Sequence, residues 1–116
     1  MITPKKQLFD LTYLKKIDDQ GLIDDLINLY LMETQSGLLQ MKKAFDKPDY
    51  EAIHTIVDQL KITTGMIQAS AFYSVLEEIE KISKYGGEYY QLLEQEHFAQ
   101  YEFKQLKYEL ELYLKC

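Results

Sequence analysis

The stretch "DYEAIHTIVDQLKITTGMIQASAFYSVLEEIEK", residues 49–81, carries two series of apolar positions, and the second continues one residue beyond it. The positions are Ile53, Ile56, Val57, Leu60, Thr64 and Ile67 in the first series, and Phe72, Val75, Leu76, Ile79 and Ile82 in the second. Spacings of three and four residues place each series on one face of an α-helix. The stretch therefore predicts two amphipathic helices joined by a short turn.

The same period continues on both sides of this stretch. The preceding helix, from about residue 20 to 45, is expected to bury Leu22, Leu26, Leu29, Tyr30, Glu33, Gly37, Met41 and Ala44. Gly86-Gly87 separates the last helix from the helix that contains Phe72 and Ile79. The last helix is expected to bury Leu92, Ala99, Phe103, Leu106 and Leu110, with Tyr89, Glu96 and Tyr113 on the same face. A short helical turn is expected around residues 11–17. Without an alternating strand pattern, these helices predict an all-α, antiparallel four-helix bundle with a short extra N-terminal helix, as a single domain over residues 1–116.

Composition and charge narrow the classes of partner. The 116 residues include thirteen lysines and no arginine, and the net charge is -6. Nucleic acids and anionic membranes both attract basic surfaces, so we expect neither as a partner and favour another protein. The apolar runs are shorter than the roughly 18 residues of a membrane span, and residues 1–6 lead into no apolar signal region, so a cytoplasmic location is expected.

Few residues of this chain are suited to binding a metal or cofactor. The only cysteine is Cys116, which leaves no internal disulfide and no cysteine-based metal cage. His54 and Asp58 lie four residues apart, but zinc takes three or four protein ligands and no others are evident. His97, on the last expected helix, has the character of a surface histidine. We expect no metal and no cofactor.

A polar stripe is predicted on the outer side of the helix that begins near Asp49. His54, Asp58, Lys61 and Gly65 recur at spacings of three and four residues, with Ile62 beside them. One interpretation is a solvated face on which Asp58 and Lys61 form a weak i, i+3 ion pair.

The stripe also resembles a known signalling family. The chain is similar to the histidine-phosphotransfer (HPt) domain over most of its length, from "FDLTYLKKI" to the helix behind the stripe. The family motif is His-x-Leu-Lys-Gly, then a small residue about eleven positions after the histidine, then an apolar series ending in Leu-Glu. Here the motif reads Asp58-Gln59-Leu60-Lys61-Ile62, followed by Ala69 and by a series that ends at Ile79-Glu80. The resemblance therefore places Asp58 at the phosphoacceptor position.

A second register would place the acceptor at His54. The first three residues then fit, but the fourth and fifth, Val57 and Asp58, do not. This register also moves Asp49 and Ala69 four residues away from their places in the motif. Both flanks thus favour Asp58, with His54 one turn earlier on the same face.

The resemblance implies a role in two-component phosphorelay, but the residues argue against phosphate transfer. Transfer requires a neutral, nucleophilic imidazole, whereas a carboxylate with an ordinary pKa of about 3.9 is charged at neutral pH. The branched side chain of Ile62, where the family has glycine, covers the approach to the acceptor. We therefore predict a docking or regulatory module without enzymatic activity, which binds a receiver (response-regulator) domain or a sensor kinase. The predicted docking residues are His54, Asp58, Gln59, Lys61, Ile62 and Gly65.

Two alternatives remain open at this stage. Residual phosphotransfer could pass through His54. The chain could also be a structural bundle that keeps only the fold, either as a monomer or as a weak homodimer that associates through its helix faces.

Overall fold

The computed structural model describes residues 7–115, and they form a bundle of helices. The helices are α1 (Thr12–Lys15), α2 (Gln20–Asp46), α3 (Tyr50–Met66), α4 (Ser70–Tyr85) and α5 (Tyr89–Lys115). No strand occurs within the described residues. The predicted all-α fold with a short N-terminal helix is confirmed, and Cys116 lies outside the described part.

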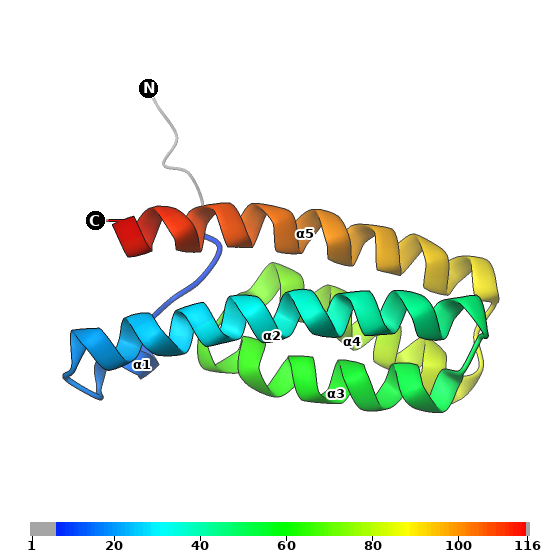
Figure 1. The fold of residues 1–116 in the computed structure, drawn as a ribbon. Helices are drawn as coiled ribbons and strands as arrows, with labels where there is room; N and C mark the ends of the chain where they lie inside the picture. Colours follow the sequence, from blue (N-terminus) through cyan, green and yellow to red (C-terminus); the bar gives the residue numbers. More distant parts are fainter. Residues whose placement is uncertain (1–6, 116) are drawn as a thin grey trace, which may run out of the picture.

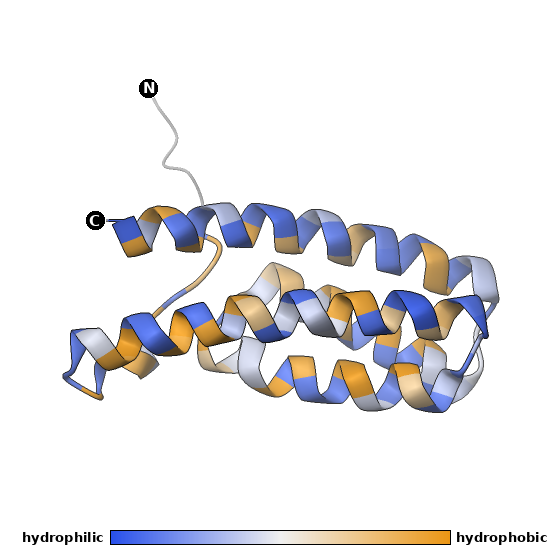
Figure 2. Ribbon diagram, in the orientation of Figure 1, coloured by the Kyte–Doolittle hydropathy of each residue, from blue (hydrophilic) through white to orange (hydrophobic). Residues whose placement is uncertain are grey.

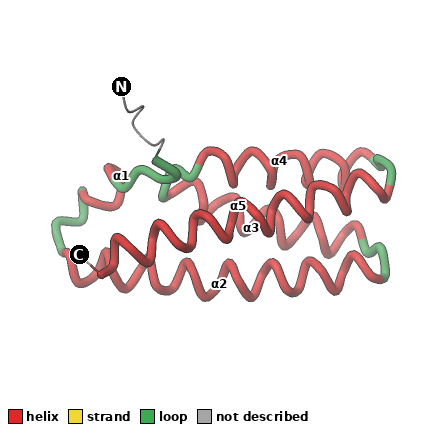
Figure 3. Tube along the Cα trace, turned by 90° about the horizontal axis from the view of Figure 1, so that it is seen from above, coloured by secondary structure: helices red, strands yellow, loops and turns green. Residues whose placement is uncertain are grey.

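The four long helices run alternately in opposite directions (Figure 1). Seen from above, α4 and α2 lie at the two sides while α5 passes over α3 (Figure 3). Helix α3 packs against α2 and α4, and α5 packs against the same two helices. Helices α3 and α5 are therefore diagonally opposite, and the contact between α2 and α5 is the loosest of the four.

Local sequence determines where the long helices begin and end. The side chains of Asp19 and Asp49 cap α2 and α3 by accepting hydrogen bonds from the backbone N–H groups of Leu22 and Ala52, each at 3.1 Å. At the end of α4, Gly86 adopts a left-handed conformation with φ of 77°, and its N–H donates to the carbonyl of Ile82. The break expected at Gly86-Gly87 is confirmed.

The core lies between the four helices, where the apolar faces seen in Figure 2 meet. On α3, α4 and α5 most of the predicted core positions are confirmed. The fully or nearly fully buried ones are Ile53, Val57, Leu60, Thr64, Ile67, Phe72, Leu76, Ile79, Leu92, Ala99, Phe103, Leu106 and Leu110. The predicted Ile56, Glu96 and Tyr113 are only partly buried. Val75 and Ile82 are partly buried against this core. Tyr89 is 38% exposed, but its hydroxyl donates to the carbonyl of Phe45 at 2.8 Å and so ties α5 to the end of α2.

The predicted core face of α2 is confirmed at Tyr30 and Met41, but elsewhere it is displaced by about one residue. Leu22 and Leu29 are each 44% exposed, and Glu33 is exposed as well. The residues that α2 buries are Ile23, Ile27, Tyr30, Leu31, Thr34, Leu38, Met41 and Phe45. Apolar side chains occupy so much of the circumference of α2 that the sequence permits two faces about 100° apart. The observed face avoids burying the carboxylate of Glu33, which would be costly.

One polar contact lies inside the core between α2 and α3. The hydroxyls of Tyr30 and Thr64 are 2.8 Å apart, and both residues are buried. Burial raises the pKa of Tyr30 to about 12, because the charged phenolate loses its solvation there. The pair satisfies two buried hydroxyl groups and fixes how α2 and α3 lie against each other.

The segment before α1 closes one end of the bundle. The backbone N–H of Asp10 donates to the carbonyl of Ile67 at 2.9 Å, at the end of α3. The buried ring of Phe9 meets Tyr113 of α5 edge-on, with ring centres 6.3 Å apart. This segment therefore connects the end of α3 to the C-terminal part of α5.

Candidate functional site

The outer face of α3 carries the residues that the resemblance selects. We call it the acceptor face and define it as His54, Asp58, Lys61, Ile62 and Gly65. Asp58, Ile62 and Gly65 are exposed, and Ile62 has 65% of its surface open to solvent. His54 and Lys61 are partly buried. The five residues do share one side of the helix, but only part of it is accessible.

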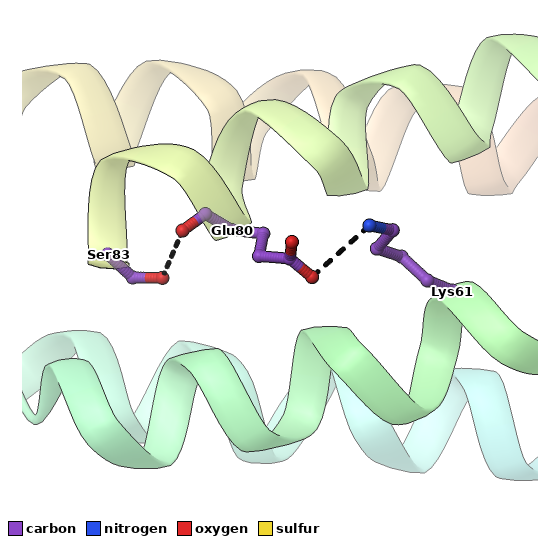
Figure 4. Close-up of polar contacts among 3 residues, drawn as sticks. All are labelled: Lys61, Glu80 and Ser83. Atoms are coloured by element: carbon purple, nitrogen blue, oxygen red, sulfur yellow. Dashed lines mark hydrogen bonds and ion pairs between the residues drawn. The ribbon is translucent and has the colours of Figure 1, made fainter. Parts of the chain in front are cut away.

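Lys61 is held by the neighbouring helix. Its Nζ lies 3.2 Å from Oε2 of Glu80 on α4, and the two side chains are only 16% and 22% exposed. Figure 4 shows this contact bridging α3 and α4, together with the hydroxyl of Ser83, which donates to the backbone carbonyl of Glu80 at 3.0 Å. The ion pair therefore joins the two helices at the acceptor face.

The ion pair expected between Asp58 and Lys61 is not formed within the described residues, because Lys61 turns toward α4 instead. Partial burial by itself lowers the pKa of Lys61, but the hydrogen bond and charge of Glu80 outweigh it, so the pKa lies above its ordinary value. The ammonium group also lies 5.3 Å from the centre of the Tyr73 ring. Lys61 thus has a structural role in this bundle, whatever else it contacts.

Several other positions of the motif are explained by packing. Leu60 is 6% exposed and Ala69 is 1% exposed, at the turn that joins α3 to α4. A larger side chain than alanine would have to displace core atoms at this turn. Phe72 and Ile79 continue the same core along α4. These positions, and the Lys61–Glu80 pair, stabilise the pairing of α3 with α4 rather than forming a reactive centre.

His54 lies one turn before Asp58 and is only partly open to solvent. Its Nδ1 atom is buried and has no hydrogen-bond partner among the described residues. A buried nitrogen of this kind is out of reach of an incoming phosphoryl group. His54 therefore offers at most its other ring nitrogen to a partner.

Gln59 lies on the side of α3 that faces α2, whereas Lys61 lies on the side that faces α4. It lines an open groove between α2 and α3 together with Met32, Gly37, Ile56 and Thr63, among others. A Cβ atom at Gly37 would lie 2.9 Å from Cδ2 of Leu60, so glycine allows the two helices to approach closely here. The groove adds a partly apolar surface beside the acceptor face.

Other types of site are not apparent in the described part of the chain. Residues 7–115 contain no group of three or more histidine, cysteine, aspartate or glutamate side chains that could hold a metal ion. His97 is exposed on α5, as expected of a surface histidine. None of the helices within these residues is both long and apolar enough to cross a lipid bilayer.

Sequence reasoning selected the acceptor face but missed the partner of Lys61. Glu80 was recognisable only as the end of the apolar series in the motif, 19 residues after Lys61. Its role depends on how α3 and α4 pair across the turn, which local spacing does not specify. Tyr73, which packs near Lys61, was likewise missed.

No protein-family model matches this chain, and no curated protein or solved structure matches it significantly.

Proposed function

We propose that this chain is an HPt-like domain of two-component phosphorelay signalling that does not accept phosphate and instead docks a receiver domain or a sensor kinase. The observation that carries the proposal is the exposed pair Asp58 and Ile62 on α3, at the positions where the family motif has its phosphoacceptor histidine and a glycine. A four-helix bundle with α3 and α4 joined by the Lys61–Glu80 pair is compatible with this proposal.

The chemistry of the acceptor face supports the loss of phosphotransfer. Asp58 is an exposed carboxylate, and it would be repelled by the acidic, magnesium-binding pocket of a receiver domain. To be phosphorylated itself, it would need a metal-binding cluster of acidic residues, and no such group occurs in residues 7–115. His54 is partly buried and offers at most one ring nitrogen, since its Nδ1 is buried. The domain therefore binds without accepting phosphate.

The same face is suited to docking. Ile62 exposes 65% of its surface beside the charged Asp58, and the groove next to it contains apolar side chains, including Ile56 and Met32. An apolar centre with a polar rim is the usual arrangement of a transient protein interface. Lys61 contributes less directly, since its ammonium group is already paired with Glu80.

Binding to purified receiver domains and kinase phosphotransfer domains tests the proposal. At least one partner from the organism that encodes this chain is expected to bind the wild-type protein, and Ile62→Asp should weaken that binding at least tenfold. Leu39→Asp is the matched control, because Leu39 is 56% exposed but lies on α2, facing the groove between α2 and α5. Binding that is lost equally in both variants, or no binding to any receiver or kinase, would contradict the proposal.

A further inference from the structure

An open groove of about 700 Å³ runs between α2 and α5, the two neighbouring helices with the loosest contact in the bundle. Its lining on α2 extends from Asn28 to Lys42, which is about four helical turns or 20 Å. Met32 and Leu39 lie at its edge and are more than half exposed. Its floor consists of buried core residues, namely Leu31, Leu38 and Phe103. The groove therefore offers an apolar surface that is long enough for a helix.

Positive charge lines this groove on both sides. Lys42 contributes from α2, and a second hollow on the side of α5 contains His97, Lys104 and Lys107. The two hollows share lining residues, namely Gln35, Gln100 and Phe103, and we call them together the α2–α5 groove. Within residues 7–115 no aspartate or glutamate lines either hollow. On a chain with a net charge of -6, the groove is thus a local surface of the opposite sign.

The lysines of the groove are available to a partner. Neither Lys42 nor Lys104 takes part in an ion pair within the described residues, where Lys61–Glu80 and Lys81–Glu78 are the pairs formed. The Nζ atom of Lys107 donates to Oε1 of Gln35 across the groove at 3.1 Å, and its ammonium group has two further N–H groups to donate. A carboxylate placed here would therefore meet cations that no carboxylate of this chain neutralises.

We propose that the α2–α5 groove binds an acidic, amphipathic α-helix of another protein. Apolar side chains spaced three and four residues apart on that helix cover Met32, Leu39 and the floor, which is how amphipathic helices bind in apolar grooves. Aspartates and glutamates on the two flanks of the same helix pair with Lys42 on one side and Lys104 on the other. Charge gives this contact its specificity, and the apolar side chains give it most of its buried area.

The sign of the charge disfavours other occupants. Residues 1–6 of this chain contain Lys5 and Lys6 and no acidic residue, so they carry the same sign as the groove. A second copy packed groove to groove would place lysines against lysines. A nucleic acid would be repelled by the net charge of the rest of the chain. A short acidic helix meets none of these obstacles.

This inference does not rest on the proposed docking of a receiver or kinase. In the bundle the pair α2 and α5 lies across from the pair α3 and α4, which includes the acceptor face. Met32 and Ser36 line both the α2–α5 groove and the groove between α2 and α3, so the test variants leave them unchanged.

Fluorescence anisotropy with a labelled peptide of about 15 residues tests the proposal. The peptide carries leucines three and four residues apart on one face and glutamates on both flanks, and a second peptide has lysine in place of every glutamate. At protein concentrations up to about 500 µM, the wild type should bind the acidic peptide about tenfold more tightly than the lysine peptide, or better. No binding of the acidic peptide, or equal binding of the two, would overturn the proposal.

Paired charge reversals locate the binding site. Lys42→Glu/Lys104→Glu should weaken binding of the acidic peptide about tenfold or more, because attraction becomes repulsion at both sides of the groove. Lys81→Glu/Lys84→Glu makes the same change in net charge on α4 and should leave the affinity within about twofold of the wild type. All four lysines are exposed, so the melting temperatures should be unchanged. Equal weakening by the two pairs would show attraction by overall charge and contradict the groove.

Leu39→Asp and Ile62→Asp separate this site from the acceptor face. Leu39→Asp should weaken binding of the acidic peptide about fivefold or more, while Ile62→Asp should have no effect, the reverse of what receiver docking predicts. Loss of peptide binding in Ile62→Asp alone would place the peptide on α3 and overturn the proposal. Sedimentation equilibrium without peptide should give 13.7 kDa. A larger mass that returns to this value in Lys42→Glu/Lys104→Glu would assign the groove to a second copy and also overturn it.

Discussion

Ile53 and Ile62 are isoleucines on the same helix, yet the first is completely buried and the second is 65% exposed. The face of α3 around Ile53 is packed into the core on all sides, and its polar residue, Thr64, is hydrogen-bonded to Tyr30. The face around Ile62 contains an unburied carboxylate at Asp58 and one lysine that is tied to α4. The inner face therefore maintains the bundle, while most of the outer face is free to be specialised for binding.

Replacing each isoleucine with alanine tests this difference most strongly. Ile53→Ala removes fully buried methyl groups and leaves a cavity, so the free energy of unfolding should fall by about 3 kcal/mol. Ile62→Ala should change it by less than about 0.5 kcal/mol. Urea unfolding followed by circular dichroism measures both values. A similar loss in the two variants would mean that Ile62 is part of the core.

Removing the buried hydroxyl pair of the inner face should lower the free energy of unfolding by less than Ile53→Ala does, and the loss should depend on pH. Tyr30→Phe leaves Thr64 without its partner, so we expect a loss of about 1.5 kcal/mol at pH 7. The pKa of Tyr30 rises to about 12 on folding, so the unfolded chain loses this proton first, from pH 10 upward. The stability that the neutral hydroxyl contributes is complete below pH 10 and is lost as the pH rises through 12.

Unfolding of the wild type and Tyr30→Phe across this range measures the contribution of Tyr30 alone, since the other tyrosines are common to both. The advantage of the wild type should shrink above pH 10, vanish about one pH unit higher and be reversed by pH 12. A difference that stays constant from pH 8 to pH 12 would show that Tyr30 titrates normally and is not buried as described.

On the outer face, the Lys61–Glu80 pair should contribute less to the free energy of unfolding than the buried Tyr30–Thr64 pair does. A double-mutant cycle with Lys61→Met and Glu80→Gln is expected to give a coupling energy of about 1 kcal/mol, because both side chains are more than three-quarters buried. The matched cycle uses Lys81 and Glu78, a pair on α4 whose atoms are 3.7 Å apart and whose side chains are mostly exposed. Its coupling should be about 0.3 kcal/mol or less and should fall further in 1 M salt. Equal coupling in the two cycles would remove the structural role assigned to Lys61.

Local features made most of the fold predictable from the sequence. Asp49 and Gly86 mark helix ends through hydrogen bonds within a few residues, and regular spacing identified the buried face wherever polar residues alternate clearly with apolar ones. The same reasoning misplaced the face of α2, because Leu22 and Ile23 are both apolar and only packing decides which one is buried. The acceptor face was predictable because its residues lie on one helix. The Lys61–Glu80 contact was not, because it depends on the alignment of two helices.

We propose that α3 keeps the position of a phosphoacceptor without its reactivity, and a phosphotransfer assay tests this proposal most directly. The wild-type protein is incubated with a ³²P-labelled phosphorylated receiver domain and, separately, with phosphoramidate as a small-molecule donor to histidine. His54→Ala and Asp58→Asn serve as the matched variants. We expect no label on any of the three proteins. A base-stable label that disappears in His54→Ala, or an acid-stable but base-labile label that disappears in Asp58→Asn, would contradict the account.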